Sequence, residues 1–177
     1  SAVANSLAAI QSGATQVQGT INGYGERCGN ANLCSIIPNL QLKMGKKVIT
    51  TKQLKTLTSL SHHISEIANL SPNNQLPFVG HSAFAHKAGI HAKAVLADPA
   101  TYEAINPTHF GLSREISIGH NLTGWNAVRN RAEALGLSLA DTTLRDLTQH
   151  IKSQADHTTL TTAEVDEILI QAGSEQS

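Results

Sequence analysis

The residues best suited to chemistry gather in one short stretch, residues 78–107. Its alanine-rich framework leaves room for a ligand and carries titratable and aromatic side chains: His81, His86, Lys87, His91, Lys93, Tyr102 and Glu103. Lys87 and His91 are four apart, so on a helix they would share one face. A neighbouring ammonium disfavours the imidazolium, and this spacing therefore predicts a neutral His91 that can act as a general base. The alternative is that these histidines pack against a core or lie in solvent.

A glycine-rich loop over residues 22–32 is the second candidate. Its sequence, NGYGERCGNAN, combines backbone freedom with polar side chains, among them Glu26, Arg27 and Asn30. Polar loops beyond the carboxyl ends of strands are where α/β folds place their sites. The loop has neither the phosphate-loop nor the dinucleotide-binding spacing. A tight turn with an internal Glu26–Arg27 network is the alternative.

These stretches must be positioned by the elements before residue 78. The pattern predicts a helix over 1–11 ended by Gly13, a strand over 14–21, and a helix over 33–42 that Pro38 interrupts. A long amphipathic helix capped by Thr50 or Thr51 is expected next, and its buried stripe would be Leu54, Leu57, Leu60, Ile64 and Ile67. Residues 69–77 are dense in turn formers and are expected to be a linker.

Helices should dominate the rest of the chain. Residues 83–97 are expected to form a helix that stops before Pro99, with Asp98 capping a second short turn. The later elements are predicted, in order, as a strand over 114–119, a helix from Thr123 closed by Gly136, a helix capped by Asp141 through Ile151, and a last helix behind a capping box at 161–164. Residues 174–177 are expected to fray.

Composition narrows the class of protein. Thirteen basic and thirteen acidic residues leave no net charge, which argues against a nucleic-acid or membrane partner. No apolar run could span a bilayer, and no signal peptide is expected. Cys28 and Cys34 do not make a disulfide framework, so a cytoplasmic location is expected. The chain starts at Ser1 inside a helical pattern, which predicts that the true start lies upstream.

Three segments carry a resemblance to a known family. They are VANSLAAIQSGATQVQGTINGYGERCGNANLCSIIPNLQLKMG, FAHKAGIHAKAVLADPATYEAINP and LTGWNAVRNRAEALGL. Together they resemble the isopropylmalate, homocitrate and citramalate synthases, the Claisen-condensing branch of the metal-dependent pyruvate-carboxylase-like TIM barrels. The first segment is most similar to citramalate synthases, which use pyruvate. The other two are also similar to homocitrate synthases, which use 2-oxoglutarate.

The resemblance implies a fold of α/β plus α class. Residues 1–68 would be the C-terminal end of a TIM (β/α)8 barrel with a trailing helix, residues 69–77 the linker, and residues 78–173 a mostly helical linker subdomain. Within the barrel, residues 1–11 would be the seventh helix, 15–22 the last strand and 31–44 the last helix.

The resemblance also implies a site. In this family a divalent metal (Mg²⁺, Mn²⁺ or Zn²⁺) is held by an early Asp, an HxH pair and the Asn of a GN pair, and this chain contains only the last, as Asn30. A histidine followed eleven residues on by a tyrosine, both delivered by the partner subunit, acts at acetyl-CoA, and His91 and Tyr102 match these positions. Glu26 is a further catalytic candidate, and Arg27 and His86 are candidate substrate-binding residues.

The function that the resemblance implies is an acyltransferase that joins acetyl-CoA to a 2-oxo acid, with pyruvate favoured, in branched-chain amino-acid or related biosynthesis. It would work as a homodimer with exchanged subdomains, and this chain alone is expected to be inactive. Homocitrate synthase and 2-isopropylmalate synthase are the alternatives, and a non-catalytic helical dimerisation module is an alternative of another class. An independent histidine-rich metal binder is disfavoured because the nine histidines show no compact ligand spacing.

Overall fold

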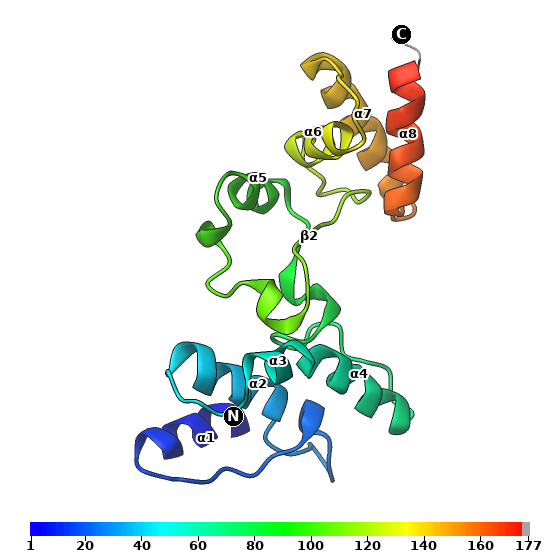
Figure 1. Ribbon diagram of the computed structural model, residues 1–177. Helices are drawn as coiled ribbons and strands as arrows, with labels where there is room; N and C mark the ends of the chain where they lie inside the picture. The colour runs from blue at the N-terminus through cyan, green and yellow to red at the C-terminus, as the bar shows by residue number, and fades with distance from the viewer. Residues whose placement is uncertain (175–177) are drawn as a thin grey trace. The chain divides into compact units, whose positions relative to one another are not determined.

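The computed structural model describes residues 1–174, which are mostly helical (Figure 1). They form two compact units, each with its own hydrophobic core. The first unit comprises residues 1–84 and 105–113, and the second comprises residues 85–104 and the chain from residue 114 onward. None of the helices in this described part is long and apolar enough to cross a bilayer.

The first unit is built from short helices. In chain order they are α1 (Ala2–Gln11), the 3-10 turn η1 (Ile21–Gly23), α2 (Leu33–Pro38), the π-helical turn η2 (Asn39–Lys43), α3 (Thr51–Lys55), α4 (Leu57–Ile67), and the 3-10 turns η3 (His81–Phe84) and η5 (Pro107–Phe110). Its core consists of residues from several of these elements, joined by Val79 from the segment before η3: Cys34, Leu54, Leu57, Val79 and Phe110. Residues 69–77 lie within this unit, and their role as a domain linker stays a prediction.

The residues predicted to begin and end helices of the first unit are confirmed in that role. Gly13, just after α1, has a φ of 108°, which glycine adopts without strain. Pro38 is the last residue of α2, and the chain continues from it as a π-helical turn because proline has no N–H to donate to the preceding turn. Thr50 and Gln53 form a reciprocal capping box at the start of α3.

The prediction of a regular strand over residues 14–21, before the glycine-rich loop, is wrong. In the described residues this segment makes a single parallel bridge, Thr20 to Asn32, and then turns into η1. The two backbones approach closely there, because a Cβ on Gly19 would lie 2.4 Å from the Ala31 carbonyl oxygen. A β-strand requires a neighbouring backbone along its length, and one bridge does not provide that.

The predicted stripe of the long helix is also partly wrong. The helix breaks at Thr56 into α3 and α4, and the apolar side chains of Leu60 and Ile67 are 39% and 70% exposed. Ser61 and Ser65 are buried in their place, at 3% and 1%. The physical reason is a buried amide, Asn22, which needs polar partners where an apolar stripe would have left it unpaired.

The second unit combines two very short strands with helices. Its elements are β1 (Ala85–His86), α5 (Gly89–Ala97), the 3-10 turn η4 (Pro99–Thr101), β2 (Glu115–Ile116), α6 (Trp125–Ala134), α7 (Asp141–Ala155) and α8 (Thr162–Ser174). The strands pair in parallel, with Ala85 opposite Glu115 and His86 opposite Ile116. Figure 1 shows α6, α7 and α8 packed side by side around the core of this unit, to which Ala92 of α5 also contributes.

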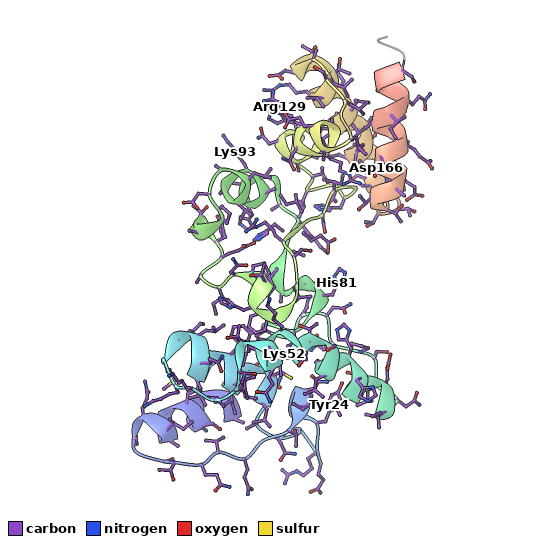
Figure 2. All side chains as sticks on the ribbon, in the orientation of Figure 1. Tyr24, Lys52, His81, Lys93, Arg129 and Asp166 are labelled. Atoms are coloured by element: carbon purple, nitrogen blue, oxygen red, sulfur yellow. The ribbon has the colours of Figure 1, made fainter. Side chains whose placement is uncertain are left out.

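Two cation–π contacts and two ion pairs hold these helices together. The guanidinium groups of Arg129 and Arg145 both lie over the ring of Trp125, with their central carbons 4.3 and 4.1 Å from its centroid. Arg129, labelled in Figure 2, also pairs with Asp141. On the other side of α6, Arg131 makes a two-bond ion pair with Asp166 of α8, also labelled there.

The expected helix over 83–97 begins later than predicted. Residues 85 and 86 use their backbones to pair with β2, so α5 starts only at Gly89. Lys87 therefore lies before the helix, and the proposed Lys87–His91 helix face does not exist. The strand expected over 114–119 is likewise reduced to Glu115–Ile116.

Most of the residues predicted to begin or end helices of the second unit are confirmed in that role. The carboxylate of Asp98 accepts from the backbone N–H of Ala100 and caps η4. Gly136 follows α6 with a φ of 76°. Thr161 and Glu164 form the expected capping box before α8. The predicted Asp141 cap is wrong, because Asp141 is the first residue of α7 and Ala140 occupies the capping position. The expected tail lies outside the described residues apart from Ser174, which belongs to α8.

Candidate functional site

The structure brings His91 and Tyr102 together. His91 is the third residue of α5, and Tyr102 directly follows η4. Their ring centroids are 4.7 Å apart, at an interplanar angle of 45°. The turn between them is tied back to the helix because the Thr101 hydroxyl donates to the Ala94 carbonyl over 3.1 Å. Both rings are exposed, Tyr102 to 51%. An imidazole and a phenol thus lie side by side, and an external ligand can reach both. The position of α5 in Figure 2 can be found from its labelled residue Lys93.

Glu103 forms a charged cluster next to this pair, in which its own side chain is covered and that of Arg114 is partly exposed. Its side chain is only 5% exposed, and its two oxygens accept from Arg114 Nε over 2.7 Å and Arg114 Nη2 over 2.6 Å. The Arg114 guanidinium lowers the pKa of Glu103 and outweighs the effect of burial, and His86 lowers it further. Glu103 is therefore a carboxylate, and it raises the pKa of Arg114 in turn.

His86 is part of the Glu103 cluster. Its Nε2 lies 3.0 Å from Oε1 of Glu103, and its side chain is 14% exposed. Sequence reasoning noticed the side chains of His86 and Glu103 but not their partnership with Arg114. No helix or strand spacing links Glu103 to Arg114, so the only available signal was the opposite charge of the two residues.

His120 is a second histidine that the sequence analysis passed over. Its Nδ1 accepts from the backbone N–H of Leu122 over 3.2 Å, and its Nε2 lies 3.1 Å from the Ser117 carbonyl oxygen. Burial lowers the pKa of His120, the Ser117 carbonyl opposes that effect, and the ammonium of Lys87 lowers the pKa further. The ammonium of Lys87 was expected to keep His91 neutral, but the histidine whose pKa it lowers is His120.

The glycine-rich loop is anchored by Asn22, which is buried with a φ of 61°. Its amide nitrogen donates to the Ser61 carbonyl and to Ser65 Oγ, over 2.8 and 3.1 Å. Its amide oxygen accepts from Ser61 Oγ over 2.6 Å and from the Cys34 thiol over 3.6 Å. Burial raises the pKa of that thiol. All of the amide's bonding capacity is used to attach the loop to α2 and α4.

Asn30 is oriented by the same loop. Its amide nitrogen donates to the Tyr24 carbonyl over 3.0 Å, and the Tyr24 hydroxyl contacts Ser65 Oγ at 3.0 Å (Tyr24 is labelled in Figure 2). Because the carbonyl must receive a donor, the amide oxygen of Asn30 is directed elsewhere. Asn30 is exposed, and its oxygen is a hard ligand of the kind that Mg²⁺ and Mn²⁺ prefer.

The other loop candidates stay predictions. Glu26 and Arg27 are exposed, and Arg27 adopts a φ of 56°. The alternative, an internal Glu26–Arg27 network, is not among the interactions of the described residues. Within residues 1–174, no group of three or more His, Cys, Asp or Glu side chains could hold a metal ion. Asn30 therefore fits as one ligand of a site that needs others.

Comparison with known proteins matches both parts of the chain. Residues 1–64 match the HMGL-like family, and residues 78–159 match the family described as homocitrate synthase post-HMGL domain-like. The chain is 56% identical over 138 residues to the (R)-citramalate synthase of Synechocystis sp., covering 78% of this chain and 25% of that protein. The (R)-citramalate synthase of Aquifex aeolicus is 52% identical over 138 residues, with 78% and 26% covered.

A mitochondrial homocitrate synthase from Schizosaccharomyces pombe is matched over a longer range. It is 40% identical over 172 residues, covering 95% of this chain and 40% of that protein. The chain thus spans a quarter to two fifths of the length of the curated relatives described here.

Proposed function

Because the chain belongs to the HMGL-like synthase family, we propose that it is part of an acyltransferase that condenses acetyl-CoA with a 2-oxo acid. Pyruvate is the favoured oxo acid, since the citramalate synthases are more similar in sequence than the homocitrate synthase. 2-Oxoglutarate and 2-oxoisovalerate are the alternatives. The observation that carries the proposal is the exposed His91–Tyr102 pair, with ring centroids 4.7 Å apart.

The proposed reaction joins two carbon skeletons. His91 removes a proton from the methyl group of acetyl-CoA, and the resulting enolate carbon attacks the ketone carbon of the oxo acid. Tyr102 donates a proton to the alkoxide that forms. Water then hydrolyses the thioester, which releases CoA and a branched 2-hydroxy diacid. The contact between the two rings supports this proposal, because such a transfer requires both groups to lie close to the reacting atoms.

A divalent metal is proposed as the cofactor. When bound, it polarises the ketone of the oxo acid as a Lewis acid. In this chain the amide oxygen of Asn30 would be one of its ligands, held in place by the bond to the Tyr24 carbonyl. Glu26 is proposed to act near this site, and Arg27 and His86 to help bind substrate.

The remaining parts of the proposal concern the whole protein. Residues 1–68 would close a TIM barrel, and the second unit would deliver His91 and Tyr102 to the barrel of a partner subunit. The exposure of both rings supports this arrangement. The chain by itself carries one metal ligand and is proposed to be inactive. A cytoplasmic location suits the free thiols of Cys28 and Cys34.

The test is CoA release by the full-length protein, followed with a thiol reagent. Acetyl-CoA and Mg²⁺ or Mn²⁺ are supplied with pyruvate, 2-oxoisovalerate or 2-oxoglutarate in turn. We expect release with pyruvate and a loss of about 10²–10⁴-fold in His91→Ala, the range for removal of a general base. The control is His157→Ala, which removes an exposed histidine of the same unit.

Three outcomes would change the proposal. Release with another oxo acid alone would reassign the substrate. Undiminished release in His91→Ala would remove His91 from the mechanism. No release with any oxo acid would refute the synthase function and favour a non-catalytic dimerisation module.

A further inference from the structure

Helix α5, which carries His91, begins without a capping side chain of its own. The residue in the capping position is Ala88, which offers no side-chain acceptor. Gly89, the first helical residue, instead donates its N–H to the Leu122 carbonyl over 3.1 Å. The first N–H groups of a helix have no partner inside it, so this external acceptor satisfies one of them and, together with the β1–β2 pairing, helps to set where the helix starts. His91 lies two residues after Gly89, and its position depends on that start.

The imidazole of His120 holds the segment that supplies this acceptor. The carbonyl oxygen of Ser117 can only accept a hydrogen bond. Nε2 of His120 must therefore carry the proton and donate the hydrogen bond to this oxygen. The other ring nitrogen, Nδ1, is then the acceptor for the N–H of Leu122. The Ser117 N–H donates to the His86 carbonyl over 2.9 Å. A continuous path of hydrogen bonds thus runs from His86 through Ser117, His120 and Leu122 to Gly89.

The same segment touches α5 directly through two glycines. A Cβ on Gly89 would lie 2.7 Å from the Cα of Gly124, and a Cβ on Gly124 would lie 2.6 Å from the Cα of Gly89. Gly124 has an ordinary φ of −97°, so the requirement for glycine here is one of space. The turn itself is closed by Thr123, which is buried and whose hydroxyl accepts from the His120 N–H over 3.2 Å. The start of α5 therefore packs against residues 117–124.

We propose that His120 is a positioning residue for the reaction: its neutral imidazole holds residues 117–124 as an external cap of α5 and so places His91 against Tyr102. The inference rests on the proposed function of His91. His120 itself does not act on substrate, since both of its ring nitrogens are occupied by backbone groups of its own turn.

Two amide variants separate the two ring nitrogens. In His120→Asn the side-chain oxygen can replace Nδ1 and accept from the Leu122 N–H. In His120→Gln the longer side chain can replace Nε2 and donate to the Ser117 carbonyl, but the Leu122 N–H loses its acceptor. A misplacement of about 1 Å in a catalytic group costs about 10²-fold in rate. We expect kcat of the full-length protein to fall by roughly 10–100-fold in His120→Gln and by less than about threefold in His120→Asn.

The kinetic test compares kcat with KM. The KM for the 2-oxo acid should stay within about twofold of wild type in both variants, because a positioning defect lowers kcat. Gly124→Ala should lower kcat in the same way by displacing Gly89. His157→Asn is the control, since that histidine is exposed and lies outside the turn. Equal losses in His120→Asn and His120→Gln, or no loss in either, would overturn the inference.

Hydrogen–deuterium exchange provides a readout that does not depend on activity. Amides of residues 89–92 should exchange faster in His120→Gln than in wild type and His120→Asn, while those of α6 to α8 stay unchanged and show that the variant is folded. If wild type releases no CoA, the proposed function fails but this exchange pattern still tests the cap. Unchanged exchange at residues 89–92 in His120→Gln would refute it.

Discussion

At the scale of single residues, Glu103 shows how a charge can be held inside this unit. Its carboxylate accepts two bonds from one guanidinium and lies 3.0 Å from an imidazole nitrogen. A buried carboxylate without such partners would become protonated instead. The cluster joins the residue after Tyr102 to β1 through His86 and to Arg114, next to β2. Glu103 therefore helps to hold the candidate catalytic tyrosine in place.

We predict that Glu103→Gln destabilises the protein by about 2 kcal/mol, because hydrogen bonds to a charged group contribute about 1.5–3 kcal/mol and Arg114 remains partly solvated. The free energy of unfolding in urea measures this. Glu133→Gln, at an exposed glutamate of α6, is the matched control and should change stability by less than about 0.5 kcal/mol. Equal effects of the two substitutions would contradict the role given to Glu103.

The same substitution should change the pH dependence of stability. The pKa of Glu103 is lowered from its usual 4.5, so below that pH the unfolded state binds more protons than the folded state. The contribution of Glu103 to the free energy of unfolding is fully present above about pH 4.5. It is lost as the pH falls through the pKa that Glu103 has in the folded state. The groups that face it, Arg114 and His86, are both basic. Urea unfolding between pH 6 and 3 should therefore show a steeper loss in wild type than in Glu103→Gln, and parallel curves would count against this.

At the scale of elements, α4 buries hydroxyls and leaves apolar side chains outside. Ser65 donates to the Ser61 carbonyl and contacts Asn22 and the Tyr24 hydroxyl. The helix thereby serves as a polar anchor for the loop that carries Asn30. Its amphipathic pattern alone would have buried Leu60 and Ile67 in place of the two serines, while Leu57 is buried as the pattern predicts.

We predict that Ser65→Ala destabilises the protein by about 1–2 kcal/mol, because Asn22 and Tyr24 lose a buried partner. Ser59→Ala is the matched control on the same helix, since the Ser59 hydroxyl is exposed and bonds only within its own turn. Thermal unfolding of the two variants gives the comparison. A control variant as unstable as Ser65→Ala would show that helix propensity, and not the anchor, is responsible.

At the scale of the whole molecule, the chain exposes large apolar side chains on both units. Ile67 is 70% exposed in the first unit, and Ile90 and Leu122 are 74% and 62% exposed in the second. Ile90 is next to His91, and the carbonyl of Leu122 caps the same helix. Apolar groups beside a candidate site suggest a surface that another chain covers.

We therefore predict that the isolated chain self-associates. Sedimentation velocity over a range of concentrations should show species larger than a monomer, and Ile90→Glu with Leu122→Glu should shift the distribution towards the monomer. Lys93→Glu, on an exposed position of α5, is the control for added negative charge. A monodisperse monomer at all concentrations would refute the prediction.

The sequence by itself determined the features that depend on neighbours within a few residues. The Asp98 cap, the Thr50 and Thr161 capping boxes and the glycine after α6 all follow from contacts inside one turn. The family, too, was readable from motifs that lie intact in the chain. The histidine and tyrosine of the second motif were predicted as a pair, and the structure brings their rings together, although their catalytic roles stay a prediction.

Only the tertiary structure decided which polar groups became partners. Asn22 meets Ser61 and Ser65 across 39 and 43 residues, and Glu103 meets His86 across 17. Hydrophobic periodicity describes which face of an element is apolar, but a buried amide such as Asn22 can shift the buried face by requiring polar partners. Such a requirement is satisfied in space, by chain segments that no local spacing connects, and so it appears only once the chain has folded.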